Sequence, residues 1–134
     1  MQMARSDVYV LDTHTLLWHL SGDRRRLSRR AMRTLRRAEQ DRDITILVPA
    51  VVLAEAITAI ERRKVRLGIG DLLGRIDSTG FEIVPLDLDV IRAMLEFPSG
   101  LELHDRMIAA TARHYDGKLI SRDPDIARVI DVIW

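Results

Sequence analysis

The chain has 134 residues, 47% of them hydrophobic and 31% charged, with a formal net charge of +1. This length and apolar content suit one compact domain over residues 1–134. The absence of cysteine excludes disulfides and thiolate metal sites, and no apolar run approaches the roughly 18–20 residues of a membrane helix, so we expect a cytoplasmic protein without a signal peptide at its start.

Runs of β-branched and apolar residues alternate with segments in which apolar residues recur every three or four positions. Glycine, proline and aspartate mark the breaks between them, and Ser28 and Asp87 are candidate helix caps. In chain order the sequence predicts a strand at 8–11, helices at 13–20 and 24–40, a strand at 44–48, helices at 49–64 and 71–78, a strand at 81–84, helices at 88–97 and 105–115, a strand at 118–121, a helical turn from 124 and a strand at 129–133. This alternation is typical of an α/β fold with a central, mainly parallel sheet and helices on both faces.

Four acidic residues fall where these elements would bring them to one end of the sheet. Asp12 and Asp123 closely follow predicted strands. Glu55 lies beside the apolar stripe of helix 49–64, and Asp105 starts helix 105–115. Ligands of open parallel sheets bind at the carboxyl ends of the strands. Carboxylates gathered there repel one another unless a cation is present, and all-oxygen sites suit Mg²⁺ or Mn²⁺, so the sequence predicts a metal site able to support phosphodiester cleavage.

Each acid also has an ordinary structural explanation. Asp12, Asp105 and Asp123 all stand where aspartate commonly caps a helix. Glu55 alternatively lies at the edge of its helix and reaches an arginine. Asp125 is either a peripheral acid of the cluster or a solvated side chain. Taken together, the positions of the four acids are stronger evidence than any one of them.

Four stretches of the chain resemble the PIN domain, and in particular the VapC-type toxin ribonucleases of type II toxin–antitoxin pairs. They are 11–18 (LDTHTLLW), 49–56 (PAVVLAEA), 104–112 (HDRMIAATA) and 119–123 (LISRD), and they occur in the family's order. The resemblance implies a three-layer PIN-like fold and a metal-dependent endoribonuclease that acts as a toxin.

The resemblance also implies roles for particular residues and partners. The family's acids, which bind Mg²⁺ or Mn²⁺ and carry catalysis, match Asp12, Glu55, Asp105 and Asp123. The residues expected to support them are Thr13, Ser121 and Asp125. The implied partners are an RNA substrate, a small cognate antitoxin that covers the site, and a second copy of the chain in a homodimer.

Arginine is concentrated in residues 24–37, which contain eight of them. A dense basic helix is typical of contact with phosphates. The candidate RNA-binding residues are therefore Arg25, Arg29 and Arg33, with His14 and His104 close to the acids. A solvated helix face, or contact with acidic groups of a partner protein, would explain the same run. Aromatic residues make up only 4% of the chain, which argues against a base-stacking platform, and we expect Trp18 in the core.

Other classes of protein fit the pattern less well. A phosphotransfer domain of the haloacid dehalogenase type would need a second aspartate where His14 stands, and a response-regulator receiver would need acids before Asp12, where the chain has Val10 and Leu11. A non-catalytic PIN-like module that binds RNA or protein remains the alternative from another functional class.

Overall fold

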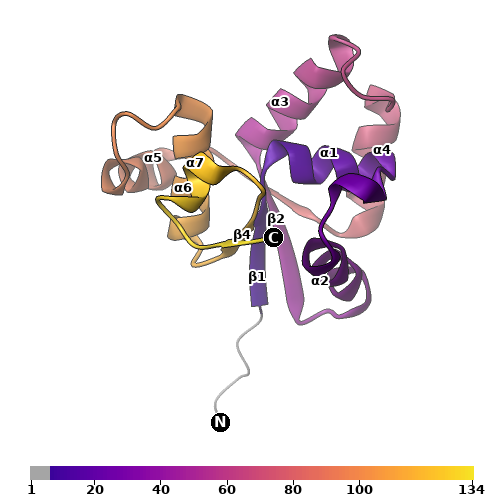
Figure 1. Cartoon of the computed structure of the whole chain (residues 1–134), viewed down its shortest axis with the longest axis horizontal. Coiled ribbons are helices and arrows are strands. Elements are labelled where there is room, and N and C mark those ends of the chain that lie inside the picture. The colour runs from indigo at the N-terminus through magenta and orange to yellow at the C-terminus, as the bar shows by residue number, and fades with distance from the viewer. Residues whose placement is uncertain (1–6) are drawn as a thin grey trace.

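The computed structural model describes residues 7–134. The prediction that the chain starts without a signal peptide falls on residues 1–6 and lies outside the described residues. A five-stranded sheet with the order β3-β2-β1-β4-β5 forms the centre of the molecule, and all four strand pairs are parallel (Figure 1). The elements are β1 (Asp7–Leu11), α1 (Thr13–Ser21), the 3-10 turn η1 (Arg24–Arg26), α2 (Arg29–Gln40), β2 (Ile44–Pro49), α3 (Ala50–Glu61), α4 (Ile69–Thr79), β3 (Glu82–Val84), α5 (Leu88–Ala93), the 3-10 turn η2 (Met94–Glu96), α6 (Leu103–His114), β4 (Lys118–Ile120), α7 (Pro124–Ala127) and β5 (Val132–Ile133).

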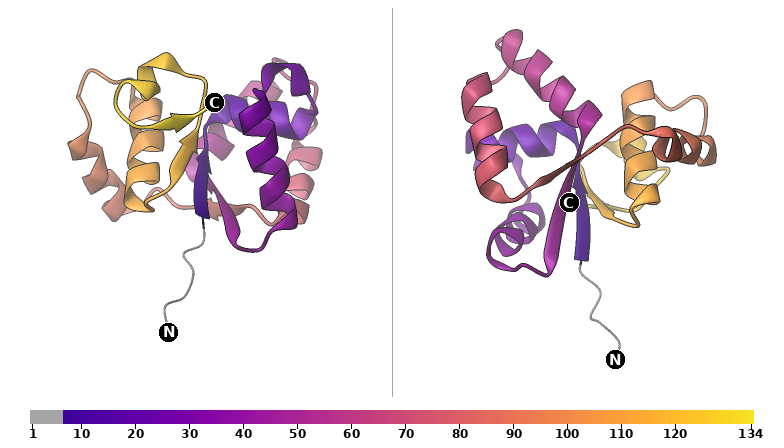
Figure 2. Two further views of the ribbon diagram at one scale, coloured as in Figure 1. Left: turned by 60° about the horizontal axis from the view of Figure 1, so that its bottom comes forward. Right: turned by 180° about the vertical axis from the view of Figure 1, so that it is seen from behind.

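The direction in which the chain crosses the sheet reverses at β1. From β1 the chain moves outward through β2 to β3, and then returns to β4 on the other side of β1 and ends at β5. The helices α1 to α4 therefore cover one face and α5 to α7 the other, which the views in Figure 1 and Figure 2 both show. The three-layer α/β fold that the sequence predicts is confirmed. Because the strand order reverses between β1 and β4, the ends of these two strands open a crevice suited to a ligand.

The core gathers around β1. Val10 and Leu11 of this strand are completely buried, as are Leu16 and Leu20 of α1 on one face. On the other face α6 packs against β1 and β4, and the three buried alanines of this helix, at positions 109, 110 and 112, allow a close approach. The two strands that flank the crevice are therefore held from both sides.

The boundaries of two predicted helices are wrong in an informative way. The predicted helix 24–40 is divided into η1 and α2, because the Ser28 hydroxyl accepts a hydrogen bond from the Ala31 backbone N–H (3.0 Å) and starts a new helix. The predicted helix 105–115 begins at Leu103, since the Glu102 carboxylate accepts from the Asp105 N–H (3.0 Å). Asp105 is therefore in the first turn of α6 and is not its cap.

The other differences are smaller. Pro49, expected in the first turn of a helix, ends β2 opposite Val84, and α3 follows it and ends at Glu61 instead of residue 64. Asp87 caps α5 as expected, but this helix gives way to η2 before residue 97. The last strand is reduced to two residues, Val132 and Ile133. Within residues 7–134, no helix has both the length and the apolar character needed to cross a membrane.

Gly117 joins α6 to β4 at a point where the chain touches β1. A Cβ atom at this position would lie 3.0 Å from Cγ2 of Val10 and 3.2 Å from Cγ1 of Val8. Val10 is completely buried and cannot move away easily. A side chain at residue 117 would therefore press β4 away from β1 at the start of β4, at the opposite end of this strand pair from the crevice.

We predict that Gly117→Ala lowers the free energy of unfolding by about 1–3 kcal/mol, the usual effect of overpacking. Urea denaturation measures this change. Gly100→Ala is the matched control, because a Cβ atom there meets nothing within 4 Å, and its effect should stay within about 0.5 kcal/mol. Equal stabilities of the two variants would contradict the close contact with β1.

Candidate functional site

Asp12 lies at the end of β1, where it caps α1 and also lines the crevice between β1 and β4. Its Oδ1 accepts a hydrogen bond from the Thr15 backbone N–H (2.9 Å), and the residue is only 6% exposed. Leu11 pairs with Ile120 of β4, so Asp12 stands beside Ser121 at the point where the two strands end. The Thr15 hydroxyl donates to the Ile120 carbonyl oxygen (3.1 Å) and ties α1 to β4. Capping uses one carboxylate oxygen of Asp12 and leaves the other for a ligand.

Asp123 follows β4 and caps α7 in the same manner. Its Oδ1 accepts from the Asp125 N–H (2.8 Å), and its own N–H donates to the fully buried Ser121 hydroxyl (3.0 Å). Ser121 thus fixes the backbone from which Asp123 projects. The Asp125 carboxylate is exposed and lies 3.7 Å from Nη1 of Arg128, so Asp125 reaches the cluster through its backbone N–H only.

Glu55 is half-buried on α3 and is held by residues from two other helices. The Thr13 hydroxyl of α1 donates to its Oε1 (2.8 Å), and Nδ1 of His104 on α6 lies 3.7 Å from its Oε2. His104 also lies 3.0 Å from Oε1 of Glu102. The partners of Glu55 are thus a hydroxyl and an imidazole, and the alternative in which it reaches an arginine is wrong among the described residues. These contacts join helices from the two faces of the sheet.

Asp105 shows that the predicted acids share one electrostatic field. Its pKa is raised to about 6 by partial burial of its carboxyl first and then, in decreasing order, by the negative charges of Asp123, Glu102, Glu55 and Asp12. The fold therefore brings all four predicted acids near one another, from the end of β1, from α3, from α6 and from the segment after β4. Glu102, which also contributes, was not among the predicted residues, because glutamate is not a preferred cap and only the structure shows its carboxylate accepting the Asp105 N–H.

The carboxylates fit a hard divalent cation by their chemistry, and they need some movement to hold one. The donors are carboxylate oxygens without sulfur, the combination that Mg²⁺ and Mn²⁺ prefer. Burial first and neighbouring negative charges second raise the pKa of Asp105, and a cation would relieve the second of these causes. Within residues 7–134, however, no three His, Asp or Glu side chains stand close enough together to hold an ion as they are. Oxygens of Asp12, Asp123 and Glu55 are engaged by hydrogen bonds, so binding requires side-chain rotation.

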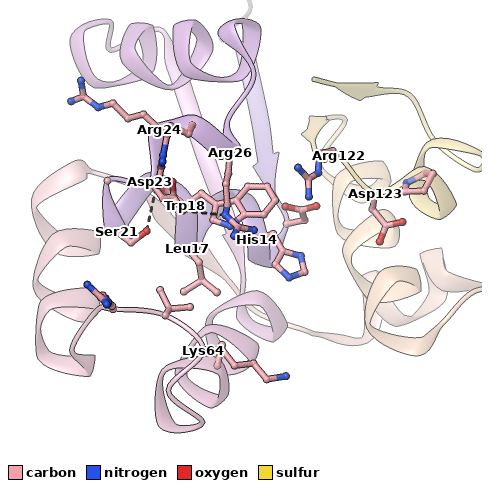
Figure 3. A pocket seen from close by; sticks show the side chains of 17 residues that line it. His14, Leu17, Trp18, Ser21, Asp23, Arg24, Arg26, Lys64, Arg122 and Asp123 are labelled. Carbon is pink, nitrogen blue, oxygen red and sulfur yellow. Dashed lines mark hydrogen bonds and ion pairs between the residues drawn. The ribbon is translucent and has the colours of Figure 1, made fainter.

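A basic groove of about 930 Å³ leads to the acids (Figure 3). Asp12 and Asp123 line one part of it, together with His14 and Trp18. The cationic residues that line it are Arg24, Arg25, Arg26, Lys64, Arg66 and Arg122. One wall is thus the segment after α1 and the other the segment after α3. The groove offers phosphate-binding groups beside a cluster that favours cations.

Only some of the candidate RNA-binding residues line the groove. Arg25 and His14 line the groove, whereas Arg29 and Arg33 are exposed on α2 and do not line it. His104 lies outside the groove beside Glu55 and Glu102. The missed cations were visible in the sequence, because Arg122 directly precedes Asp123, and Lys64 and Arg66 belong to a basic run at the end of a predicted helix.

The family model described as PIN domain matches residues 9–131 of the chain. Comparison with curated proteins gives no match. Among solved structures, the chain is similar to VapBC2 from Rickettsia felis bound to a DNA fragment from their promoter, with 17% identity, a TM-score of 0.69, and coverage of 94% of this chain and 96% of that one. It is also similar to a toxin–antitoxin complex from Klebsiella pneumoniae, with 22% identity, a TM-score of 0.65, and the same two coverages. At these identities the likeness shows a shared fold.

We predict that Asp105→Asn stabilises the metal-free protein at neutral and alkaline pH. The pKa of Asp105 in the folded protein, about 6, is above its ordinary value of 3.8, so the folded state favours the protonated carboxyl. This contribution to stability is complete below pH 3.8 and is lost as the pH rises through 6. In chelator, the variant should therefore melt higher than wild type at about pH 8, and the difference should shrink at about pH 4.5.

The matched control is Asp71→Asn, which changes an exposed aspartate in the first turn of α4. Its melting temperature relative to wild type should not vary with pH in this way. The same pH dependence in both variants would mean that the position in a first helical turn, and not the acidic cluster, determines the effect.

Proposed function

This chain belongs to the PIN domain family, and on that premise we propose that it is a Mg²⁺- or Mn²⁺-dependent endoribonuclease and the toxin of a VapC-type, type II toxin–antitoxin pair. The observation that carries the proposal is the proximity of four acids, Asp12, Glu55, Asp105 and Asp123, two of which, Asp12 and Asp123, line a basic groove. Cations along the walls suit the phosphates of an RNA strand, and acids at the end suit the ion needed to cleave one of its phosphodiesters.

The four carboxylates are the groups that would hold the ion. When bound there, a divalent cation supplies orientation and activation of water and stabilises charge on the phosphate. The chain's own residues keep these carboxylates in place. Thr13 holds Glu55 through its hydroxyl, and Ser121 fixes the backbone of Asp123. The groove arginines would bind the phosphates on either side of the cleaved bond.

The proposed partners follow from the similar structures and from the surface. The solved structures described above are toxin–antitoxin complexes, which supports a small cognate antitoxin as a partner of this chain. For the homodimer we propose the surface of α5 and its surroundings. Exposed large apolar side chains gather there at Leu86, Leu88, Ile91, Leu95 and Leu103. Asp89 and Arg92 on the same helix bring opposite charges to this surface, which suits pairing with a second copy of itself.

We predict that Asp12→Asn lowers RNA cleavage by at least about a hundredfold without unfolding the protein. Asparagine caps a helix as well as aspartate, so the change removes the charge and keeps the fold. Cleavage of RNA in Mg²⁺, in Mn²⁺ and in chelator measures the effect. Asp87→Asn is the matched control, because Asp87 caps α5 through the same kind of contact (3.1 Å to the Val90 N–H) and should leave cleavage unchanged.

The same variants separate the proposed function from its alternative. Full activity of Asp12→Asn, or of wild type in excess chelator, would exclude the metal-dependent mechanism. RNA binding by wild type without cleavage in either metal would favour the non-catalytic PIN-like module. Expression of wild type without an antitoxin should arrest growth, and expression of Asp12→Asn should not.

We predict that the groove, and not α2, provides the electrostatic part of RNA binding. Arg25→Ala and Arg66→Ala each remove a cation from the groove. Each should reduce the slope of log affinity against log salt concentration by roughly 0.7. The control is the pair Arg29→Ala and Arg33→Ala, whose side chains are exposed on α2 outside the groove. A reduced slope in the control pair would place the RNA on α2, as the sequence first predicted.

We predict that Leu95→Lys converts the homodimer to a monomer. Leu95 is 80% exposed, so a lysine there costs the fold little, but it would place a charge within an apolar interface. Light scattering coupled to size-exclusion chromatography measures the mass. Leu73→Lys, at a 45% exposed leucine on α4, is the control and should leave the mass unchanged. A wild-type monomer at all concentrations would exclude the dimer.

A further inference from the structure

Trp18 is the aromatic side chain that α1 presents to the basic groove. Its neighbours Leu16 and Leu17 are buried, whereas Trp18, which was expected in the core, packs against it but is only partly buried and also lines the groove. Figure 3 shows the indole between Arg26 and Arg122, with His14 beside it. A large π surface thus lies within a site otherwise made of charges.

Cations and a second aromatic ring surround this indole. The Arg122 guanidinium lies 4.8 Å from the ring centroid and that of Arg26 lies 5.9 Å from it. The His14 ring stacks at 5.4 Å with an angle of 25°, and Trp134 packs at 6.0 Å with an angle of 59°. Planar guanidinium groups and aromatic rings are the groups on which proteins stack unpaired nucleic-acid bases. The two arginines can also bind the phosphate of the same nucleotide.

The position of Trp18 and its two arginines relative to the acids determines which nucleotide of the RNA they would contact. His14 is two residues after Asp12 on the first turn of α1, and Arg122 directly precedes Asp123. Asp12, Asp123, Trp18, Arg26 and Arg122 all line the same groove. A base stacked at Trp18 would therefore belong to a nucleotide next to the phosphodiester that lies at the acids.

We infer that the stack formed by the Trp18 indole and the Arg122 guanidinium over its ring docks one unpaired base of the RNA beside the cleaved bond, with the base against the guanidinium group and Arg26 at its edge. The inference rests on the proposed function, because it takes RNA as the ligand of the groove. The low aromatic content of the chain excludes an extended stacking platform, but one base needs only one ring. Since a base in a duplex is covered by its neighbours, docking at Trp18 selects single-stranded segments and prefers the bases that stack most strongly.

The test compares two oligoribonucleotides of about ten nucleotides with equal charge, one of mixed sequence and one abasic at every position. The Asp12→Asn protein is used in Mg²⁺, because it keeps the cap and does not consume the RNA. We expect the mixed-sequence strand to bind about tenfold more tightly than the abasic strand. The chain has two tryptophans, so Trp134→Phe leaves Trp18 as the single indole, and its fluorescence should be quenched by the strand with bases.

Two further substitutions distinguish base docking from phosphate binding. Trp18→Ala should bring the affinity ratio of the two strands close to one, and Trp18→Phe should keep most of it. Lys64 lies in the groove but away from the indole, so Lys64→Ala should lower the affinity for both strands equally and leave the affinity ratio unchanged. If Trp18→Ala does not fold, the ratio and the quenching measured with the intact indole, together with Trp18→Phe, still decide the question.

Several results would overturn the inference. Equal affinities of the two strands would mean that the groove binds phosphates alone and that Trp18 serves the fold or a protein partner. A tenfold ratio that persists in Trp18→Ala would place the base elsewhere. Cleavage is not part of this readout, so a failure of base docking is distinguishable from a failure of the nuclease function, which the wild-type cleavage assay tests.

Discussion

The parallel pairing of β1 with β4 is the constraint on which the rest of the site depends. Leu11 and Ile120 are partners in the register, so Asp12 and the segment leading to Asp123 leave the sheet side by side. A shift of one residue would turn every side chain of a strand to the opposite face and separate the two acids. The buried hydroxyl of Thr15, bonded to the Ile120 carbonyl, and the packing of α6 on both strands hold this register.

Under the proposed function, the charges of the site would make RNA and a cation favour each other's binding. The acids repel one another, which the raised pKa of Asp105 records, and they also repel a phosphate that approaches along the groove. The groove walls attract the same phosphate through six cations. A divalent ion held by the acids would relieve this repulsion and would also attract the phosphate. Metal affinity and RNA affinity should therefore be coupled through charge without a change in fold.

The sequence predicts the fold and the acids because both depend on patterns that are local in the chain. Alternation of strands and helices predicts the parallel sheet, and each acid lies next to a strand end or a helix start. The groove depends on contacts between distant segments, so the sequence could not place it. The sequence predicts one basic helix for the arginine run, but the Ser28 cap divides it into η1 and α2. Arg24–Arg26 of η1 line the groove, whereas Arg29 and Arg33 of α2 lie outside it. The sequence also could not show that Trp18, which follows Leu16 and Leu17, lines the groove, because the groove is formed by distant segments.

Asp12 and Asp123 can each serve both as a helix cap and as a site residue, because a carboxylate has two oxygens. In each residue one oxygen accepts a backbone N–H at a helix start, which holds the side chain in place without a metal. Asp105 differs, because among the residues that the structure describes no donor is hydrogen-bonded to its carboxylate, and Glu55 is held only by side chains. The site thus has two fixed acids at the strand ends and two adjustable acids on helices from opposite faces. Glu55 and Asp105 carry no backbone cap contact, so their side chains can rotate toward a cation without breaking the caps that Asp12 and Asp123 provide.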